Sequence, residues 1–262
     1  MSGKDAPEEP APAEELHEDG LIGHLADLRS SVLRAVLAVL AVFICLLPFS
    51  EQVFTFFADP LLASLQGAEG ARVIATGVLD PFIVPLKVTF FVAFCATVPY
   101  VLYQLWRFVA PGLYRRERLL VIPIVATSTL LFYLGMAFAY LLVFKLVFEF
   151  IISVAPAAID FLPDSGKYFS FALTAFLVFG FAFEVPVAVF ILVRARVVSI
   201  AALRSKRPYV IAGSFIVAAI VTPPDVISQF LLAIPLCILY ELGIAFASIW
   251  APAPPAAEEE TA

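Results

Sequence analysis

Six long apolar stretches, separated by short polar segments, limit the folds that this chain can adopt. They cover residues 31–49, 82–106, 119–144, 168–193, 208–222 and 226–250. Five of the six have 19 residues or more, and a helix needs about 20 apolar residues to cross a bilayer. Only 15% of the residues are charged, whereas a soluble domain has about 25%. Because no stretch alternates as a barrel strand does, we predict an all-α integral membrane protein with six transmembrane helices.

The fifth stretch is shorter than a membrane is thick. Residues 208–222 would form a helix of about 22 Å at 1.5 Å per residue, against a hydrocarbon core of about 30 Å. The sequence TPPD at 222–225 reverses the chain directly afterwards, because proline removes a donor and fixes φ. We therefore predict that helices 5 and 6 form a short hairpin that thins the bilayer locally.

The basic residues predict the orientation of the chain. Alternate connections between the apolar stretches place 12 of the 16 Lys and Arg residues on one side. By the positive-inside rule this side is cytoplasmic, so we expect a multi-pass protein of the cytoplasmic (inner) membrane with both termini in the cytoplasm. The four basic residues assigned to the other side are Arg72, Lys87, Lys145 and Lys167.

The two ends of the chain differ in composition from the rest. Residues 1–23 and 251–262 are rich in Pro, Ala and Glu, and such segments bury too little apolar surface to fold alone. We expect two disordered tails around a six-helix membrane domain at 24–250. In the first outer segment, Asp59 as N-cap and Pro60 at the first helical position predict a short helix that begins there.

Glu184 is the residue of the membrane region that most requires explanation. It lies ten residues, or about 15 Å, before Arg194 in an otherwise uncharged stretch. An ionised carboxylate at that depth costs at least about 2.5 kcal/mol, so such a residue is by default a functional polar site. The alternative is a protonated packing residue that is hydrogen-bonded. Pro186 should open the helix nearby and free backbone carbonyls.

Other polar residues allow two interpretations each. Gln229 and Thr222 flank the TPPD turn and either bond a neighbouring helix or are solvated at the interface. Asp225 is most simply the cap of helix 6. Glu117 lies among arginines and either balances their charge or binds a guanidinium in a bidentate pair. Asp27 and Arg29 form a second charged site on the same face.

Several function classes lack their motifs. The sequence has no GxSxG, HExxH or phosphate-binding glycine loop, and both histidines precede the first apolar stretch. We expect no enzyme activity, no cofactor, no metal and no nucleic-acid partner. A proton-coupled secondary transporter of a small solute, which would use Glu184, is the alternative function. A structural scaffold is a third.

Six segments together resemble one family, TatC, the multispanning subunit of the twin-arginine protein translocase. They are HLADLR (24–29), YQLWRFVAPGLYRRER (103–118), LLFYLGMAFAY (130–140), FEVPVA (183–188), KRPYV (206–210) and TPPDVISQ (222–229). The resemblance implies a receptor for signal peptides with two adjacent arginines, which exports folded proteins with the proton-motive force. It also implies single-span partners of the TatA and TatB type, and a homo-oligomer within the complex.

The resemblance also assigns roles to residues. It implies that the arginine pair is bound by Glu117, supported by Phe108, and by Asp27 with Arg29. Glu184 would be an intramembrane polar site reached by a signal peptide or a partner helix. By the same resemblance, a transmembrane helix of a partner would dock at Gln229 and Thr222. Pro60 and Asp225 would serve structure or assembly. The chain departs from the family in having Asp27 where Glu is usual and Ser31 where a second basic residue is common.

Overall fold

The computed structural model describes residues 12–63, 74–109, 121–154, 164–222 and 225–250. Within these ranges the chain is helical, with an isolated bridge between Ile74 and Asp164 and no strand. Five segments are long and apolar enough to cross a membrane, which confirms the all-α membrane class. These segments are Leu28–Ala58, Asp80–Phe108, Ile122–Phe148, Ser165–Arg194 and Val226–Ile249.

The first helix is longer than the apolar stretch that predicts it. Helix α1 runs from Pro12 to Leu46 and continues into a short 3-10 turn, Leu47–Phe49. Its first turns overlap the segment 1–23 that composition predicts to be a tail, and they contain three glutamates and two leucines, which are strong helix formers. Residues 1–11 and 251–262 lie outside the described part of the chain.

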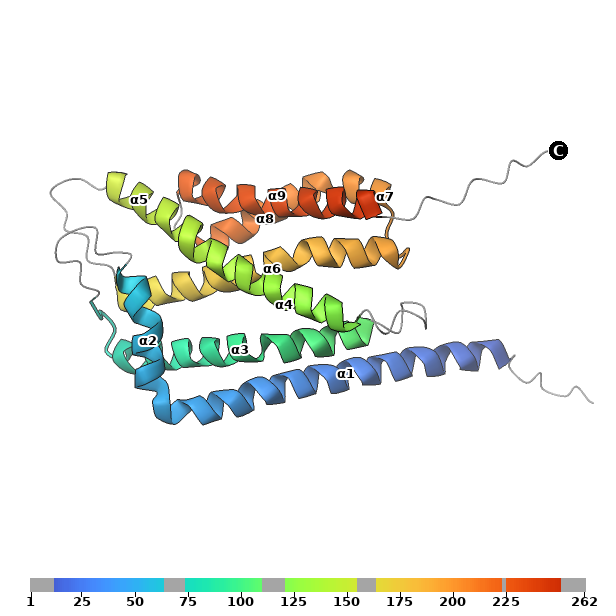
Figure 1. Cartoon of the computed structure of the whole chain (residues 1–262), viewed down its shortest axis with the longest axis horizontal. Helices are drawn as coiled ribbons and strands as arrows, with labels where there is room; N and C mark the ends of the chain where they lie inside the picture. Colours follow the sequence, from blue (N-terminus) through green and yellow to red (C-terminus); the bar gives the residue numbers. More distant parts are fainter. Residues whose placement is uncertain (1–11, 64–73, 110–120, 155–163, 223–224, 251–262) are drawn as a thin grey trace, which may run out of the picture.

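Helix α2, Ser50–Ala63, lies across one end of the bundle (Figure 1). Its Phe54 ring packs 5.2 Å from the ring of Phe169, and its Phe57 ring packs 5.6 Å from that of Phe91. The prediction that a helix begins at Asp59 and Pro60 is wrong, because both lie near the end of α2. The aromatic contacts of the preceding turns hold the chain helical from Ser50 onward.

Two long segments form the middle of the fold. Helix α3 spans Asp80–Val109 and packs along α1. The third predicted span is longer than expected, since α4 (Val121–Phe138) continues through a π-helical turn (Ala139–Val143) into α5 (Phe144–Val154). The combined helix crosses the bundle obliquely (Figure 1).

Helix α6, Ser165–Arg194, is central and packs against α3, α4 and α9. Asp164 caps its start by accepting a 2.8 Å hydrogen bond from the Lys167 amide. Contrary to expectation, Pro186 does not open α6, which stays helical through it. Proline has no amide hydrogen, so one backbone carbonyl of α6 loses its donor. The backbone of α9 packs closely against this position and holds α6 helical: a Cβ added to Gly243 of α9 would lie only 3.0 Å from Pro186 Cα.

The C-terminal helices form the predicted hairpin, but only one of them is short. Helix α7 (Ile200–Ser205) leads into α8 (Arg207–Val221), whose 15 residues span about 22 Å. Helix α9, Val226–Trp250, has 25 residues and is long enough to cross a membrane, so the expectation that helix 6 is also short is wrong. The apolar sequence of α9 extends beyond the level at which α8 begins, so α9 also packs on α7. There the Tyr240 hydroxyl of α9 donates a 2.9 Å hydrogen bond to the Leu203 carbonyl of α7.

Candidate functional site

The carboxyl group of Glu184 is enclosed in the bundle. The residue as a whole is half-buried, yet both carboxyl oxygens are inaccessible to solvent and lack a hydrogen-bond partner of good geometry among the described residues. Ser128 of α4 lies next to this group. The Ser128 hydroxyl has one proton to donate, so the alternative of a hydrogen-bonded packing residue accounts for one carboxyl oxygen at most. The other oxygen retains its capacity to bind a donor.

Ser128 links Glu184 to helix α3. Its side chain is fully buried, and its Oγ accepts a 3.0 Å hydrogen bond from Nε1 of Trp106. Trp106 on α3, Ser128 on α4 and Glu184 on α6 therefore make a polar connection across three helices. Gln104, also on α3, is buried with its Oε1 lacking a partner in the described part of the chain.

Sequence reasoning did not identify Trp106, Ser128 or Gln104. Neutral side chains in an apolar stretch carry no charge signal, and Ser and Thr are common in membrane helices. A signal was nevertheless present, because Ser128 belongs to the run TST within an otherwise apolar stretch. Chemically, the assembled group can accept hydrogen bonds inside the membrane from a polar segment that enters it.

The residues expected to bind a charged signal are only partly described. Arg29 is exposed on α1, and Phe108 is the second-last residue of α3. The N-terminal half of α1 and the C-terminal end of α3 lie at the same end of the bundle (Figure 1). Asp27 is a residue of α1 whose side chain falls outside the description, and Glu117 lies outside the described residues altogether.

The polar residues near the TPPD turn hold the hairpin together. The Gln229 amide on α9 donates a 3.0 Å hydrogen bond to the Phe215 carbonyl on α8. Thr222 is buried and donates to the Ala218 carbonyl at 2.9 Å. The Asp225 carboxylate accepts a 2.7 Å hydrogen bond from the Ser228 amide, which is the predicted cap of the last helix.

Two further features of the two ends were not anticipated. Arg207 and Glu241 form an ion pair at 2.6 Å, which ties the start of α8 to α9. At the opposite end Asp164 accepts hydrogen bonds from the amide and hydroxyl of Thr76, so the segment before α3 is fastened to the start of α6. The Thr76 hydroxyl, with help from the Lys167 amide, lowers the pKa of Asp164 below its usual value.

No described residues form a metal site, since no group of three His, Cys, Asp or Glu side chains comes together among them. Pro60, assigned to structure or assembly, belongs to α2, and its side chain is outside the description.

Comparison with protein families gives a match over most of the chain. The family described as Sec-independent protein translocase protein (TatC) matches residues 23–235. The TatC of Azotobacter chroococcum mcd 1 is 48% identical over 86% of this chain and 88% of that protein. The TatC of Escherichia coli (strain K12) is 44% identical over 88% of each. The TatC of Halothiobacillus neapolitanus is 49% identical over 88% of this chain, which spans 63% of that protein's length.

Solved structures agree with the sequence comparison. A crystal structure titled as the twin arginine translocase receptor TatC superposes with a TM-score of 0.78 at 34% identity. The match covers 86% of this chain and 98% of the solved one. A second crystal structure of that receptor, in the detergent DDM, gives a TM-score of 0.77 at 33% identity. From the family match, the relatives and the shared fold together, the chain belongs to the TatC family of Sec-independent protein translocase proteins.

Proposed function

We propose that this protein is the twin-arginine signal-peptide receptor and a core subunit of the translocase that exports folded proteins. The observation that carries the proposal is the superposition of nearly the whole membrane domain on a solved twin-arginine translocase receptor, with a TM-score of 0.78. The family match over residues 23–235 supports it independently. The protein acts by binding and conducting a substrate, and not by catalysing a reaction.

The proposed topology has six spans. Helix α8 serves as the fifth crossing, supported by its apolar composition and by its antiparallel packing on α9. Both termini then lie in the cytoplasm, as the bias of basic residues indicates, and the protein resides in the inner membrane. The membrane domain comprises residues 24–250, and α1 extends before it to Pro12.

Signal recognition takes place at the cytoplasmic end. Two carboxylates, Glu117 and Asp27, suit two adjacent arginines, because each guanidinium forms paired, charge-assisted hydrogen bonds with a carboxylate. Arg29 lies two residues after Asp27, and Phe108 belongs to the same sequence motif as Glu117; both shape the site. Because Asp27 is one methylene shorter than Glu, Glu117 is expected to contribute the larger share of the arginine binding.

Glu184 serves the next step inside the membrane. The apolar part of the signal peptide inserts beside the bundle, where its polar backbone or a partner helix meets the carboxyl group. A buried polar atom without a partner costs about 1–3 kcal/mol, so an arriving donor relieves that cost. The incoming chain is thereby bound more tightly at this depth than by apolar contact alone.

The hairpin and the outer surface of α1 are the proposed contacts for other subunits. Partner helices of the TatA and TatB type dock beside Gln229 and Thr222, with Pro60 and Asp225 maintaining the shape of the outer end. The lipid-facing side chains of α1 are largely exposed, so copies of this chain have an apolar surface on which to associate. The energy for transport comes from the proton-motive force.

Export in living cells tests the proposal. The gene for this chain would replace that of the Escherichia coli TatC, and export of a folded reporter with a twin-arginine signal would be measured. We expect export that is abolished by an uncoupler and lost with a twin-lysine signal. Glu117→Ala should remove most of it, whereas Glu241→Ala, at an exposed ion pair, should not. Lack of export by a stably inserted chain that binds its partner subunits would contradict the proposal.

A further inference from the structure

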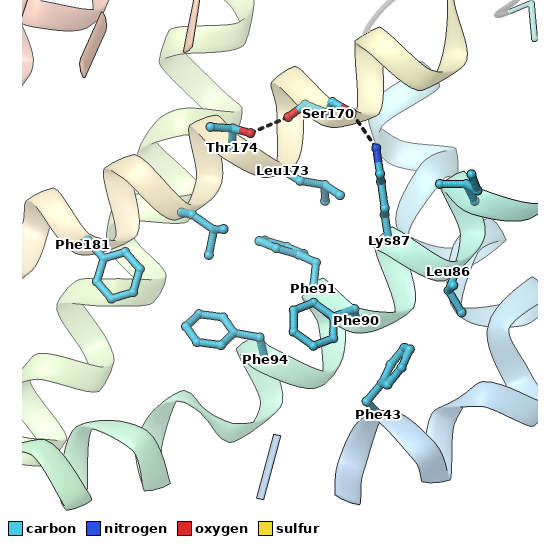
Figure 2. A pocket seen from close by; sticks show the side chains of 12 residues that line it. Phe43, Leu86, Lys87, Phe90, Phe91, Phe94, Ser170, Leu173, Thr174 and Phe181 are labelled. Carbon is cyan, nitrogen blue, oxygen red and sulfur yellow. Dashed lines mark hydrogen bonds between the residues drawn. The ribbon is translucent and has the colours of Figure 1, made fainter. Parts of the chain in front are cut away.

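A large apolar groove lies between α1, α3 and α6, toward the end of the bundle where α3 and α6 begin. Its volume is about 790 Å³. Figure 2 shows that Phe43 of α1 and Phe90 and Phe94 of α3 line one side, while Leu173 and Phe181 of α6 line the other. The proposed signal and partner sites do not include these residues.

One cation points into this groove. Lys87 of α3 extends toward α6, where its Nζ lies 3.4 Å from the Ser170 hydroxyl (Figure 2). Ser170 is its polar partner among the described residues. Two carboxylates near this end have other donors, because Asp80 accepts from the Gly77 amide and Asp164 from Thr76 and Lys167. Glu51 of α2 is exposed, and Lys87 forms no ion pair among the described residues. The positive charge of Lys87 is thus available to an anion.

Lys87 lies near the boundary between the hydrocarbon core and the headgroups. Helices α3 and α6 each have 30 residues and are about 45 Å long, so they exceed a hydrocarbon core of about 30 Å by roughly 7 Å at either end. Lys87 lies seven residues, or about 10 Å, from the first residue of α3. A lysine near this boundary extends its charged end toward the headgroups and keeps its stem among apolar groups.

The volume of the groove suits a small or chain-like ligand. Its 790 Å³ falls within the usual range for small-ligand sites, about 300–1,000 Å³. A hydrocarbon chain is much thinner than a helix and fits between aromatic rings.

We propose that the groove is a binding site for one phospholipid of the surrounding bilayer. An acyl chain lies between Phe90, Phe94 and Leu173, and the phosphate accepts charge-assisted hydrogen bonds from Lys87 and a further one from the Ser170 hydroxyl. The lipid fills the space between α1 and the α3–α6 pair. The Phe43 ring of α1 contacts the Phe90 ring of α3 at this groove, with ring centroids 5.4 Å apart.

Photolabelling of the full chain tests this site. The protein would be placed in bilayer discs that contain a small fraction of phosphatidylglycerol with a diazirine in its acyl chain. After illumination, labelled peptides would be quantified by mass spectrometry relative to the lipid-exposed peptides of α9. We expect preferential labelling of the α3 and α6 peptides that line the groove. Lys87→Gln should reduce it roughly tenfold, the loss typical of one charged hydrogen bond.

Three variants distinguish a specific site from general exposure to lipid. Lys167→Gln removes the same charge at the same end of the bundle but outside the groove, so labelling should be unchanged. Lys87→Arg keeps the charge and should preserve it, whereas Leu173→Trp fills the groove and should lower it. Equal labelling of groove and α9 peptides in all variants would overturn the proposal. So would crosslinks from a photoreactive residue at position 90 that reach a signal peptide or a single-span subunit in native membranes.

Discussion

Glu184 shows how one residue can be costly for folding and useful for transport. Both of its carboxyl oxygens are buried without a hydrogen-bond partner of good geometry among the described residues, and the one nearby donor, the Ser128 hydroxyl, can serve only one of them. Protein sites that keep such unsatisfied groups usually trade stability for function. The same carboxyl group that weakens the free protein is the one that a polar segment in the membrane can bind.

Replacing Glu184 should separate these two effects. We expect Glu184→Met to raise the unfolding free energy in detergent by about 1–3 kcal/mol, because an apolar side chain of similar length removes the unsatisfied atoms, and to lower export. Thermal unfolding and the export assay measure the two. The control is Glu241→Met, whose half-exposed ion pair with Arg207 is worth no more than about 1 kcal/mol. A destabilised but export-competent Glu184→Met would contradict this account.

Asp164 should make one end of the bundle sensitive to acid. Its pKa is lowered by the Thr76 hydroxyl and the Lys167 amide. A lowered folded pKa means that the stabilisation is fully present above the usual value of about 3.9 and is lost as the pH falls through the folded value. We expect Asp164→Asn to melt at a lower temperature than the unmodified protein. The difference between the two melting temperatures should be constant from pH 8 to 5 and should vanish below about pH 4. A difference that instead varied between pH 8 and 5 would show that another group is responsible.

Residue signals in the sequence were strongest where charge was involved. Glu184 could be identified because it is the sole charge in its stretch, and the cap by Asp225 because it precedes a helix after two prolines. The partner role of Ser128 could not, because which face of α4 meets α6 is set by packing across residues distant in sequence. For the same reason the direction of the Lys87 side chain could not be predicted, because it depends on how three helices are arranged.

Helices α4 and α6 cross with their backbones nearly in contact. A Cβ on Gly135 would lie 2.3 Å from the Phe179 carbonyl oxygen, and one on Gly180 would lie 2.7 Å from the Phe132 ring. Only glycine allows this approach, which brings Ser128 of α4 alongside Glu184 of α6. The crossing is therefore part of the intramembrane site.

Substitution at the crossing tests its importance. We expect Gly135→Ala to destabilise the protein by about 1–3 kcal/mol, since the opposing atom belongs to the backbone and cannot rotate away. Gly213→Ala on α8 is a matched control because nothing lies within 4 Å of the new Cβ, and there alanine should be neutral or stabilise the helix by up to about 1 kcal/mol. Thermal unfolding of both variants checks this, and equal effects would refute the role of close packing.

The short helix α8 should place the turn after it below the bilayer surface. Its 15 residues span about 22 Å, and α3 spans about 45 Å. A spin label at Val226, which is exposed directly after the turn, should therefore lie deeper than one at Phe82 at the start of α3. Accessibility to an apolar and a polar relaxant measures both depths. A Val226 label in the outer headgroup region of a bilayer of normal thickness would contradict local thinning.

The positions of helices were predictable from the apolar stretches, and their limits were not. Helix α2 starts at Ser50 because aromatic contacts with α3 and α6 override the local signal of Asp59 and Pro60. The π-helical turn at Ala139–Val143 and the continuity of α6 through Pro186 likewise depend on neighbouring helices.

Across the whole molecule the proposed sites are separated along the bundle. The N-terminal half of α1 and the end of α3, which carry Arg29 and Phe108, lie at one end, and α9 begins toward the other (Figure 1). Glu184 lies between them on α6. A signal peptide bound through its arginines would thus pass the carboxyl group as its apolar part enters the membrane.

The most direct test of the receptor function is photo-crosslinking from position 117 in membranes. A photoreactive amino acid there would be offered a twin-arginine signal peptide and its twin-lysine variant. We predict a crosslink to the first that is lost with the second, because a lysine ammonium cannot form the bidentate pair with a carboxylate. Equal crosslinking of both peptides, or none in membranes that still export, would contradict the assignment of the signal site to this loop.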